Sequence, residues 1–318
     1  MERRKKKAIG AFAVTGLLLI ATILFSINTG SLSISGANID IIMDLRIPRI
    51  LISIVGGAGI AVSGVLLQSV MKNPLADPGI LGISAGSSLS AILITGLVPS
   101  MYFLTPIFSF IGGVVACFLV YTLSWKDGLS AFRIILVGIT INTVFVALID
   151  CAESLMGGNN ALASFTESRL SMKGWDDFYM LLTYSVVFVV LGVLLASRCD
   201  LLALEDRTVG SLGINVTALR IKVSAVAVFL AAICTSVLGT VSFLGLLAPY
   251  IGRMLVGSGH KTLIPYSMIA GALLMLLADT TGRTIAAPNE ISAAVIMAVI
   301  GGPCFIVLLR RASGSYGR

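Results

Sequence analysis

Charged residues are scarce in this chain. Only 12% of its 318 residues are Asp, Glu, Lys or Arg, and 57% are hydrophobic. The mean hydropathy is +1.02. These polar side chains are too few to cover the core of a soluble protein. The composition therefore excludes a soluble domain and predicts an all-α membrane protein. We find no polar stretch long enough for a second domain, and residues 1–318 are expected to form a single transmembrane domain.

Residue types that carry metal or nucleophilic chemistry are equally few. His260 is the only histidine, and we expect it to be a loop residue without chemistry. The five cysteines are widely spaced, with no C-x-x-C pair and no metal-ligand spacing, so they read as small packing residues. There is no Asp-rich metal motif and no Walker motif G-x-x-x-x-G-K-[ST]. The sequence therefore predicts no catalytic residue, no cofactor and no bound metal, and it disfavours a membrane-embedded enzyme.

Carboxylates are missing from the centres of the apolar segments. Asp150 and Asp279 lie near the outer ends of theirs. Transporters driven by protons or sodium ions usually carry acidic or histidine residues inside the membrane. This absence argues against a secondary transporter and indicates that the energy source resides in another subunit.

What the sequence does contain is ten long apolar segments. Helices are expected for them, because a backbone inside a bilayer must satisfy its own hydrogen bonds. The first could be mistaken for a signal peptide, but it is long enough to span and no clear cleavage site follows. The eighth is short and contains Pro249. The segments are residues 8–28, 50–71, 79–98, 102–124, 133–151, 178–197, 219–239, 242–257, 263–280 and 291–309.

The basic residues predict the orientation, because cytoplasmic loops are enriched in Lys and Arg. With the N-terminus inside and ten spans, both termini are cytoplasmic and 17 of the 22 basic residues fall inside. The net charge of +7 is then a topology signal and requires no nucleic-acid partner. The five basic residues left outside are Arg46, Arg49, Arg169, Lys173 and Arg283.

Glycines are the other abundant feature. There are 33 of them, including Gly56, Gly57 and Gly59 in the second segment and Gly82 and Gly86 in the third. Small residues let membrane helices approach closely, so we expect tight packing at these positions. Some could also line a translocation path.

Three segments outside the spans carry further information. Arg46 and Arg49 oppose the positive-inside trend, which indicates either anchoring at the interface or a docking site for an acidic partner. Residues 68–82 contain Pro74 and Pro78, which cannot continue a helix and impose a rigid break at the inner face. Residues 200–220 form the longest inner loop, and their alternating leucines and charges predict a short amphipathic helix-turn-helix, either at the membrane surface or as a docking element for a motor.

At these residues the chain resembles the FecCD-type permease family, the membrane subunits of type II ABC importers for ferric siderophores, haem and cobalamin. The similarity runs from about Ile41 to Arg311. The motifs that carry it are R-x-P-R at 46–49, Q-x-x-x-x-N-P-L-A-D-P-G-x-L-G at 68–82, S-L-G-I-N-V at 211–216, S-F-L-G-L-L-A-P-Y-I-G-R at 242–253 and G-G-P-C-F-I at 301–306. Asp77 departs from the Glu found in many members.

The resemblance implies a ten-helix type II permease fold in a bacterial inner membrane. It implies partners as well: a second permease subunit, identical or different, two cytoplasmic ATPase subunits and an extracytoplasmic substrate-binding protein. The ATPase subunits would hydrolyse ATP. A ferric siderophore is the expected cargo, with haem or cobalamin as the alternative.

The resemblance also assigns roles to particular residues. Those expected to dock the binding protein are Arg46, Arg49 and Arg283. Those expected at a cytoplasmic gate are Asn73, Leu75, Ser130 and Ala131. The loop at about 200–216 is expected to couple to the ATPase through Leu204, Glu205, Asp206, Gly210 and Gly213.

Overall fold

The apolar segments fold into helices. The computed structural model describes residues 2–29, 42–79, 81–124, 131–155, 170–287 and 289–313. In this part of the chain each predicted segment is occupied by an apolar helix whose ends differ from the prediction by a few residues. These helices are α1 (Glu2–Asn28), α3 (Ile47–Met71), α4 (Ile83–Leu97), α5 (Thr105–Ser124), α6 (Ala131–Leu155), α8 (Trp175–Leu194), α11 (Val216–Leu238), α12 (Leu244–Val256), α13 (His260–Ile285) and α14 (Ala293–Ser313).

Not all of these helices are long enough to cross a bilayer alone. Seven meet the length and composition of a membrane span, while α4, α12 and the apolar part of α14 are shorter. With 13 residues, α12 is about 20 Å long, against a hydrocarbon thickness of about 30 Å. The structure therefore establishes a multi-span helical membrane protein, and the count of ten spans stays a prediction.

Shorter elements complete the described chain. A π-helical turn (Ile42–Arg46) leads into α3, and 3-10 turns (Pro99–Leu104 and Leu170–Met172) precede α5 and α8. Two short helices, α9 (Ala196–Leu202) and α10 (Asp206–Ser211), lie between α8 and α11. Of the helix-turn-helix predicted at 200–220, α10 lies within the loop, whereas α9 overlaps it only at residues 200–202.

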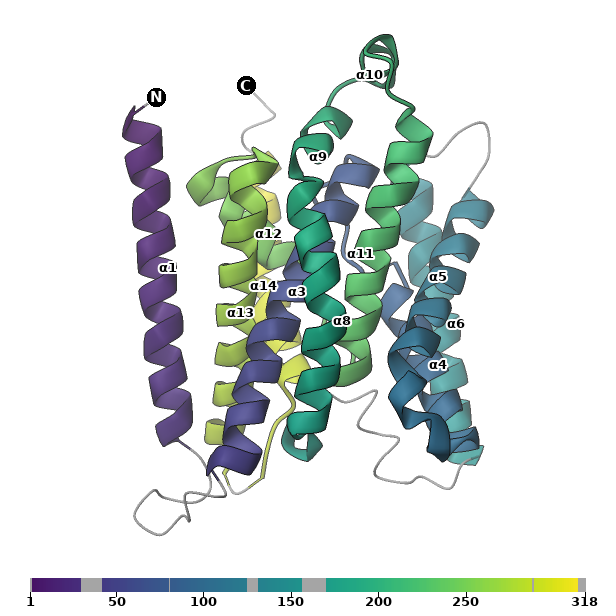
Figure 1. The fold of residues 1–318 in the computed structure, drawn as a ribbon, viewed down its shortest axis with the longest axis vertical. Helices are drawn as coiled ribbons and strands as arrows, with labels where there is room; N and C mark the ends of the chain where they lie inside the picture. The colour runs from purple at the N-terminus through teal and green to yellow at the C-terminus, as the bar shows by residue number, and fades with distance from the viewer. Residues whose placement is uncertain are drawn as a thin grey trace.

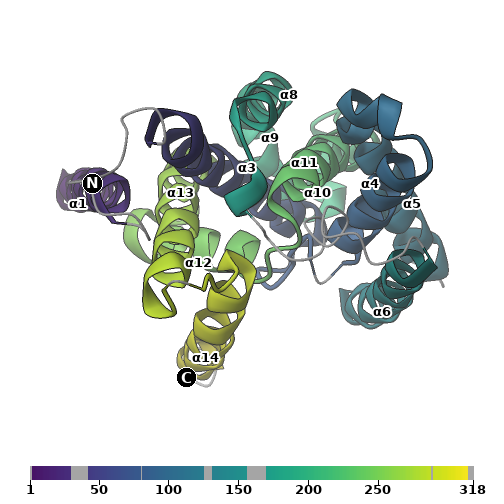
Figure 2. The same cartoon turned by 90° about the horizontal axis from the view of Figure 1, so that it is seen from below.

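The helices surround α3, which packs against α13, α11, α12 and α8 (Figure 1). On one side α1 contacts α13 and α12 at the edge of the bundle, and on the other side α4, α5 and α6 pack together (Figure 2). The start of α1, the end of α14 and α10 all lie at one end, called here the α10 end (Figure 1). The other end of the molecule, where α3 begins and α13 ends, is called here the opposite end.

Close helix contacts depend on glycine, as the sequence predicts. A Cβ atom on Gly57 of α3 would lie 2.5 Å from the carbonyl oxygen of Gly271 in α13. A Cβ on Gly64 would overlap the carbonyl of Gly245 in α12, and one on Gly86 would lie 2.7 Å from that of Gly112. Backbone-to-backbone contact of this kind replaces the hydrophobic driving force that lipid does not supply.

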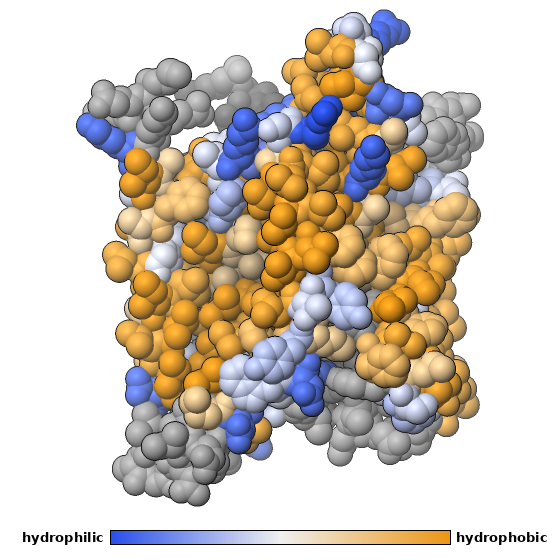
Figure 3. Space-filling model, viewed as in Figure 1, coloured by the Kyte–Doolittle hydropathy of each residue, from blue (hydrophilic) through white to orange (hydrophobic). Residues whose placement is uncertain are grey.

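The outer surface fits a bilayer. Apolar side chains cover the middle of the molecule, and polar ones gather toward the α10 end and the opposite end (Figure 3). Large apolar residues such as Leu17, Phe118 and Val299 are more than 60% exposed. In water such a surface would aggregate, so the molecule is embedded in a membrane.

Candidate functional site

A buried charge cluster occupies the opposite end. Asp279 of α13 accepts hydrogen bonds from Arg49 of α3 at 2.8 and 3.0 Å, and it lies 3.3 Å from the Nε of Arg283. Arg49 also donates to Glu290 at 2.9 Å. Arg46 donates to a backbone carbonyl at the end of α1 at 3.0 Å. Two arginines, Arg49 and Arg283, therefore meet two carboxylates, and Arg46 contacts the end of α1 beside them.

The three arginines of this cluster are those predicted to dock a partner protein. The structure brings them together, but each is at most 8% exposed. Arg49 and Arg283 share Asp279, which is 1% exposed, while Glu290 is 37% exposed. Arg49 therefore holds α3 to α13, Arg46 holds the start of α3 to α1, and docking stays a prediction. The sequence indicated nothing of this pairing, because the partners lie 230 residues apart.

The double-proline break follows α3 at the α10 end. Lys72 ends the helix with a left-handed backbone at φ 49°. The side-chain oxygen of Asn73 then accepts from the backbone N–H of Leu75 at 2.9 Å, and that of Asp77 accepts from Gly79 at 2.8 Å. These two turns, each closed by a side chain, fix the backbone on either side of Ala76. This agrees with the rigid break that the sequence predicts.

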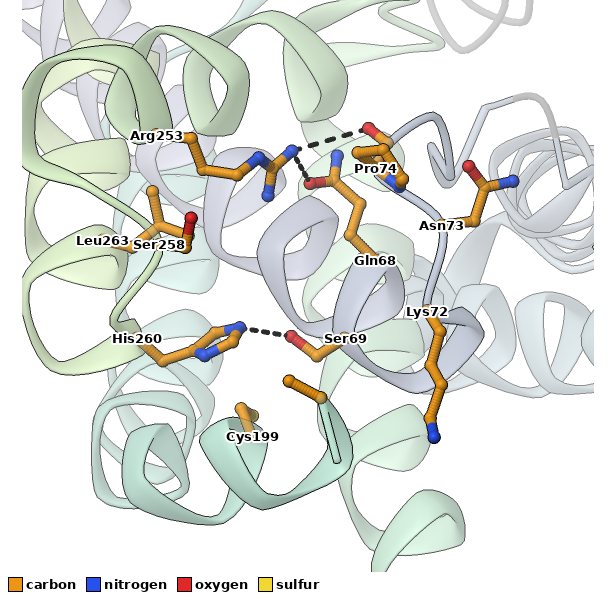
Figure 4. A pocket seen from close by; sticks show the side chains of 11 residues that line it. Gln68, Ser69, Lys72, Asn73, Pro74, Cys199, Arg253, Ser258, His260 and Leu263 are labelled. Carbon is orange, nitrogen blue, oxygen red and sulfur yellow. Dashed lines mark hydrogen bonds between the residues drawn. The ribbon is translucent and has the colours of Figure 1, made fainter. Parts of the chain in front are cut away.

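Gln68 and Arg253 hold this break against the rest of the bundle. The amide nitrogen of Gln68 donates to the carbonyls of Ala76 and Gly245, both at 3.1 Å. Its amide oxygen accepts from Arg253, which also reaches the carbonyl of Pro74 at 3.5 Å (Figure 4). Both residues belong to the motifs quoted above, but neither was predicted as a site residue. Their signal in the sequence was a polar side chain within an apolar segment.

The predicted gate can be compared with the structure only in part. Asn73 and Leu75 lie side by side in the break and are both half-buried. Ser130 lies outside the described residues, and α6 begins at Ala131. The gating role of the four residues stays a prediction. The structure adds that the Asn73 side chain is already engaged by the backbone of Leu75.

The predicted coupling loop projects at the α10 end (Figure 1). Leu202 and Val209 anchor its two short helices, at 1% and 0% exposure, whereas Leu204 and Leu212 are exposed. Glu205, Asp206, Gly210 and Gly213 are exposed too, and Gly213 follows α10 with φ +75°. The loop is therefore anchored to the bundle and offers apolar and acidic side chains outward. No contact in the structure tests its coupling role.

Lys72 links the break to this loop. Its ammonium donates to Asp206 of α10 at 3.0 Å and to the carbonyl of Leu204. Arg220 contacts the same carboxylate at 3.1 Å. The hydrogen bond from Lys72 holds the pKa of Asp206 below its ordinary value, and Arg220 adds to the effect. The sequence did not indicate this role of Lys72, because there it is only one of many basic residues on the inner side.

The structure corrects the expectation for His260. It begins α13 and is buried, where the sequence suggested a loop residue. Its Nε2 lies 2.7 Å from the Ser69 hydroxyl of α3, and its Nδ1 lies 2.6 Å from Asp200 of α9. The Asp200 carboxylate also accepts from the His260 backbone N–H at 3.0 Å, which caps the helix. The residue ties α3, α9 and α13 together.

The charges and the fold define a class. An all-helical bundle with an apolar exterior, a buried ion-pair cluster at one end and a projecting helical loop at the other is a multi-span membrane protein. Within the described ranges no group of three or more His, Cys, Asp and Glu residues could hold a metal ion. Comparison with known proteins identifies the family.

The model of the FecCD transport family matches residues 9–311. A Staphylococcus aureus (strain Newman) protein named a probable heme-iron transport system permease, IsdF, is 38% identical over 321 residues, covering 97% of each chain. A solved structure of a metal-chelate type ABC transporter, in an inward-facing conformation, aligns with a TM-score of 0.82 at 28% identity, covering 96% of this chain and 99% of that one. PsaBC from Streptococcus pneumoniae shares the fold, with a TM-score of 0.59 at 14% identity.

The chain belongs to the FecCD transport family. It is a membrane-embedded permease of the ABC importer class and a transport component, as the motifs predicted.

Proposed function

We propose that this permease carries an iron chelate across the membrane, either a ferric siderophore or haem. The match to the FecCD family over residues 9–311 carries the proposal. The relative named as a heme-iron permease favours haem over cobalamin as the alternative to a siderophore. The absence of a Walker motif from the sequence supports ATP hydrolysis by a separate subunit.

The proposal includes an orientation and a set of partners. The α10 end would face the cytoplasm of a bacterial cell, because most basic residues fall on that side. Two ATPase subunits would bind there, at the α9–α10 loop. A second permease subunit would complete the pathway, and a substrate-binding protein would deliver the cargo at the opposite end.

Uptake by cells that lack the gene tests the proposed cargo. Radiolabelled iron is supplied in separate assays as haem and as a ferric siderophore. Deletion should abolish accumulation from at least one of the two chelates, and the wild-type gene should restore it. Cobalamin uptake should not change and serves as the control. Normal uptake of both iron chelates in the deletion strain would contradict the proposal.

Docking is tested at Arg46, because this residue contacts a backbone carbonyl, whereas reversing Arg49 or Arg283 would break the ion pairs with Asp279. Arg46→Glu should slow association with the binding protein by about tenfold at low salt, and less at high salt, since charges at an interface act mainly on association rate. Surface-immobilised permease complex would report the rate. Lys222→Glu changes charge equally at the α10 end and should leave it unchanged. An unaltered rate for Arg46→Glu at low salt would reject docking at this cluster.

The gate is tested by cross-linking Leu75. Cys151 and Cys304 are exposed and must first be replaced by Ser. A Leu75→Cys variant should then cross-link to the same position in a second copy, or to the matching residue of a different partner, in a yield that changes between nucleotide-free and ATP-trapped complexes. A disulfide requires Cα atoms within about 7 Å.

Ala76→Cys is the matched control for the gate, because Ala76 is adjacent but only 3% exposed. It should not cross-link in any state. If Leu75→Cys behaves in the same way, Leu75 is a packing residue within its own subunit and the gate lies elsewhere.

A further inference from the structure

A cavity of about 270 Å³ lies at the α10 end between α3, α9, α12 and α13. Its walls come from the last turn of α3, the start of the double-proline break, α9 and the start of α13. Figure 4 shows Arg253 and Ser258 on one side of it and Ser69 with His260 on another. Polar and cationic groups from α3, the double-proline break, α12 and the start of α13 thus face one open pocket.

The cations of this cavity differ in how they are neutralised. Lys72 is paired with Asp206, while the imidazole of His260 hydrogen-bonds Asp200 through Nδ1. The same oxygen of Asp200 also accepts from the backbone N–H of His260. Arg253 has no such partner: across the described chain its hydrogen bonds go to an amide oxygen and a backbone carbonyl, and no Asp or Glu forms an ion pair with it.

Arg253 is half-buried and carries a full charge, so an anion beside it would gain a charge-assisted hydrogen bond. Both recorded bonds of Arg253 start from the same terminal nitrogen, Nη2. The other guanidinium N–H groups make no hydrogen bond within the described residues, although a planar guanidinium can bind a second acceptor through two parallel bonds. Ser258 lines the same cavity, is exposed and offers a hydroxyl.

We propose that this cavity is an anion site that binds a phosphate group through Arg253 and Ser258. The phosphate can come from free inorganic phosphate or from the headgroup of an anionic phospholipid, which present the same oxygens. A bound phosphate would lie beside the Pro74 carbonyl that Arg253 also contacts. Occupancy would therefore stabilise the double-proline break in the arrangement described above. The site does not depend on which chelate is transported.

Thermal unfolding of the full chain, purified with the subunits that accompany it, tests the site. In neutral detergent, inorganic phosphate should raise the melting temperature over chloride at equal ionic strength. In nanodiscs, phosphatidylglycerol added to phosphatidylcholine should raise it if the source is a lipid. Arg253→Gln should weaken the response at least roughly tenfold in apparent affinity, as expected for a lost charged hydrogen bond.

Two further variants make the result specific. Ser258→Asp fills the site with a carboxylate without touching the Arg253–Gln68 bond, and it should abolish the response even if Arg253→Gln folds poorly. Lys222→Gln removes one cation from the same end but outside the cavity and should respond like the wild type. A response to phosphate alone assigns the free ion, and one to phosphatidylglycerol alone assigns the headgroup. No response to either, or an equal response in Ser258→Asp, would overturn the site.

Discussion

Replacing Asp279 by Asn should lower the stability of the folded chain by about 3 to 5 kcal/mol, the cost of breaking a buried ion pair from one side. Asp279 is 1% exposed and serves both Arg49 and Arg283. The amide keeps the volume but removes the charge, so two buried guanidinium groups would face each other with only the partly exposed Glu290 nearby. The midpoint of thermal unfolding in detergent measures the loss.

Glu290→Gln is the matched control. Glu290 contacts the same Arg49 but is 37% exposed, so water can replace it and the loss should be at most about 1 kcal/mol. Adding Arg283→Gln to Asp279→Asn removes one of the two cations, and the double variant should be more stable than Asp279→Asn alone. If Asp279→Asn unfolds within a degree of the wild type, the cluster does not hold α3 to α13.

Gly213→Val should reduce transport by at least about tenfold while leaving membrane insertion intact. The residue follows α10 with φ +75°, a backbone region that costs a β-branched residue roughly 1 to 2 kcal/mol or more. No atom lies within 4 Å of the added Cβ, so backbone conformation rather than crowding decides the effect. The altered turn would misplace the exposed face of the α9–α10 loop against the ATPase.

Gly210→Val is the same substitution three residues earlier. Gly210 lies within α10, its Cβ position is also open, and a helical backbone accepts valine. This variant should retain transport and ATPase co-purification. Full activity of Gly213→Val would remove the turn from the coupling mechanism. Equal inactivity of the two variants would place the effect on the loop surface and contradict the role of its backbone.

The positions of the helices followed from local signals. Pro48 at the start of α3, the break at Asn73 and Pro74, and Gly239 and Gly257 after α11 and α12 are features that a sequence displays, because each acts on its own backbone. The class of protein was equally readable. The chain has too few charged residues for the surface of a soluble protein, and family motifs occur along most of its length. Together these two features indicated a membrane permease.

The contacts between side chains at the site could not be predicted from the sequence. Arg49 was a plausible docking residue by sequence, yet its carboxylate partner stands 230 positions away and becomes a neighbour only when α3 packs on α13. His260 was dismissed for the same reason, since Asp200 and Ser69 come from two other helices.

By itself the sequence therefore determined the helices, the breaks between them and the family, because hydropathy and backbone constraints act over a few residues. Only the tertiary structure decided which charges are buried and paired, and which are left without a counter-ion, as Arg253 is. Those properties depend on the approach of helices distant in sequence, which here requires glycines on both partners, as at Gly57 and Gly271.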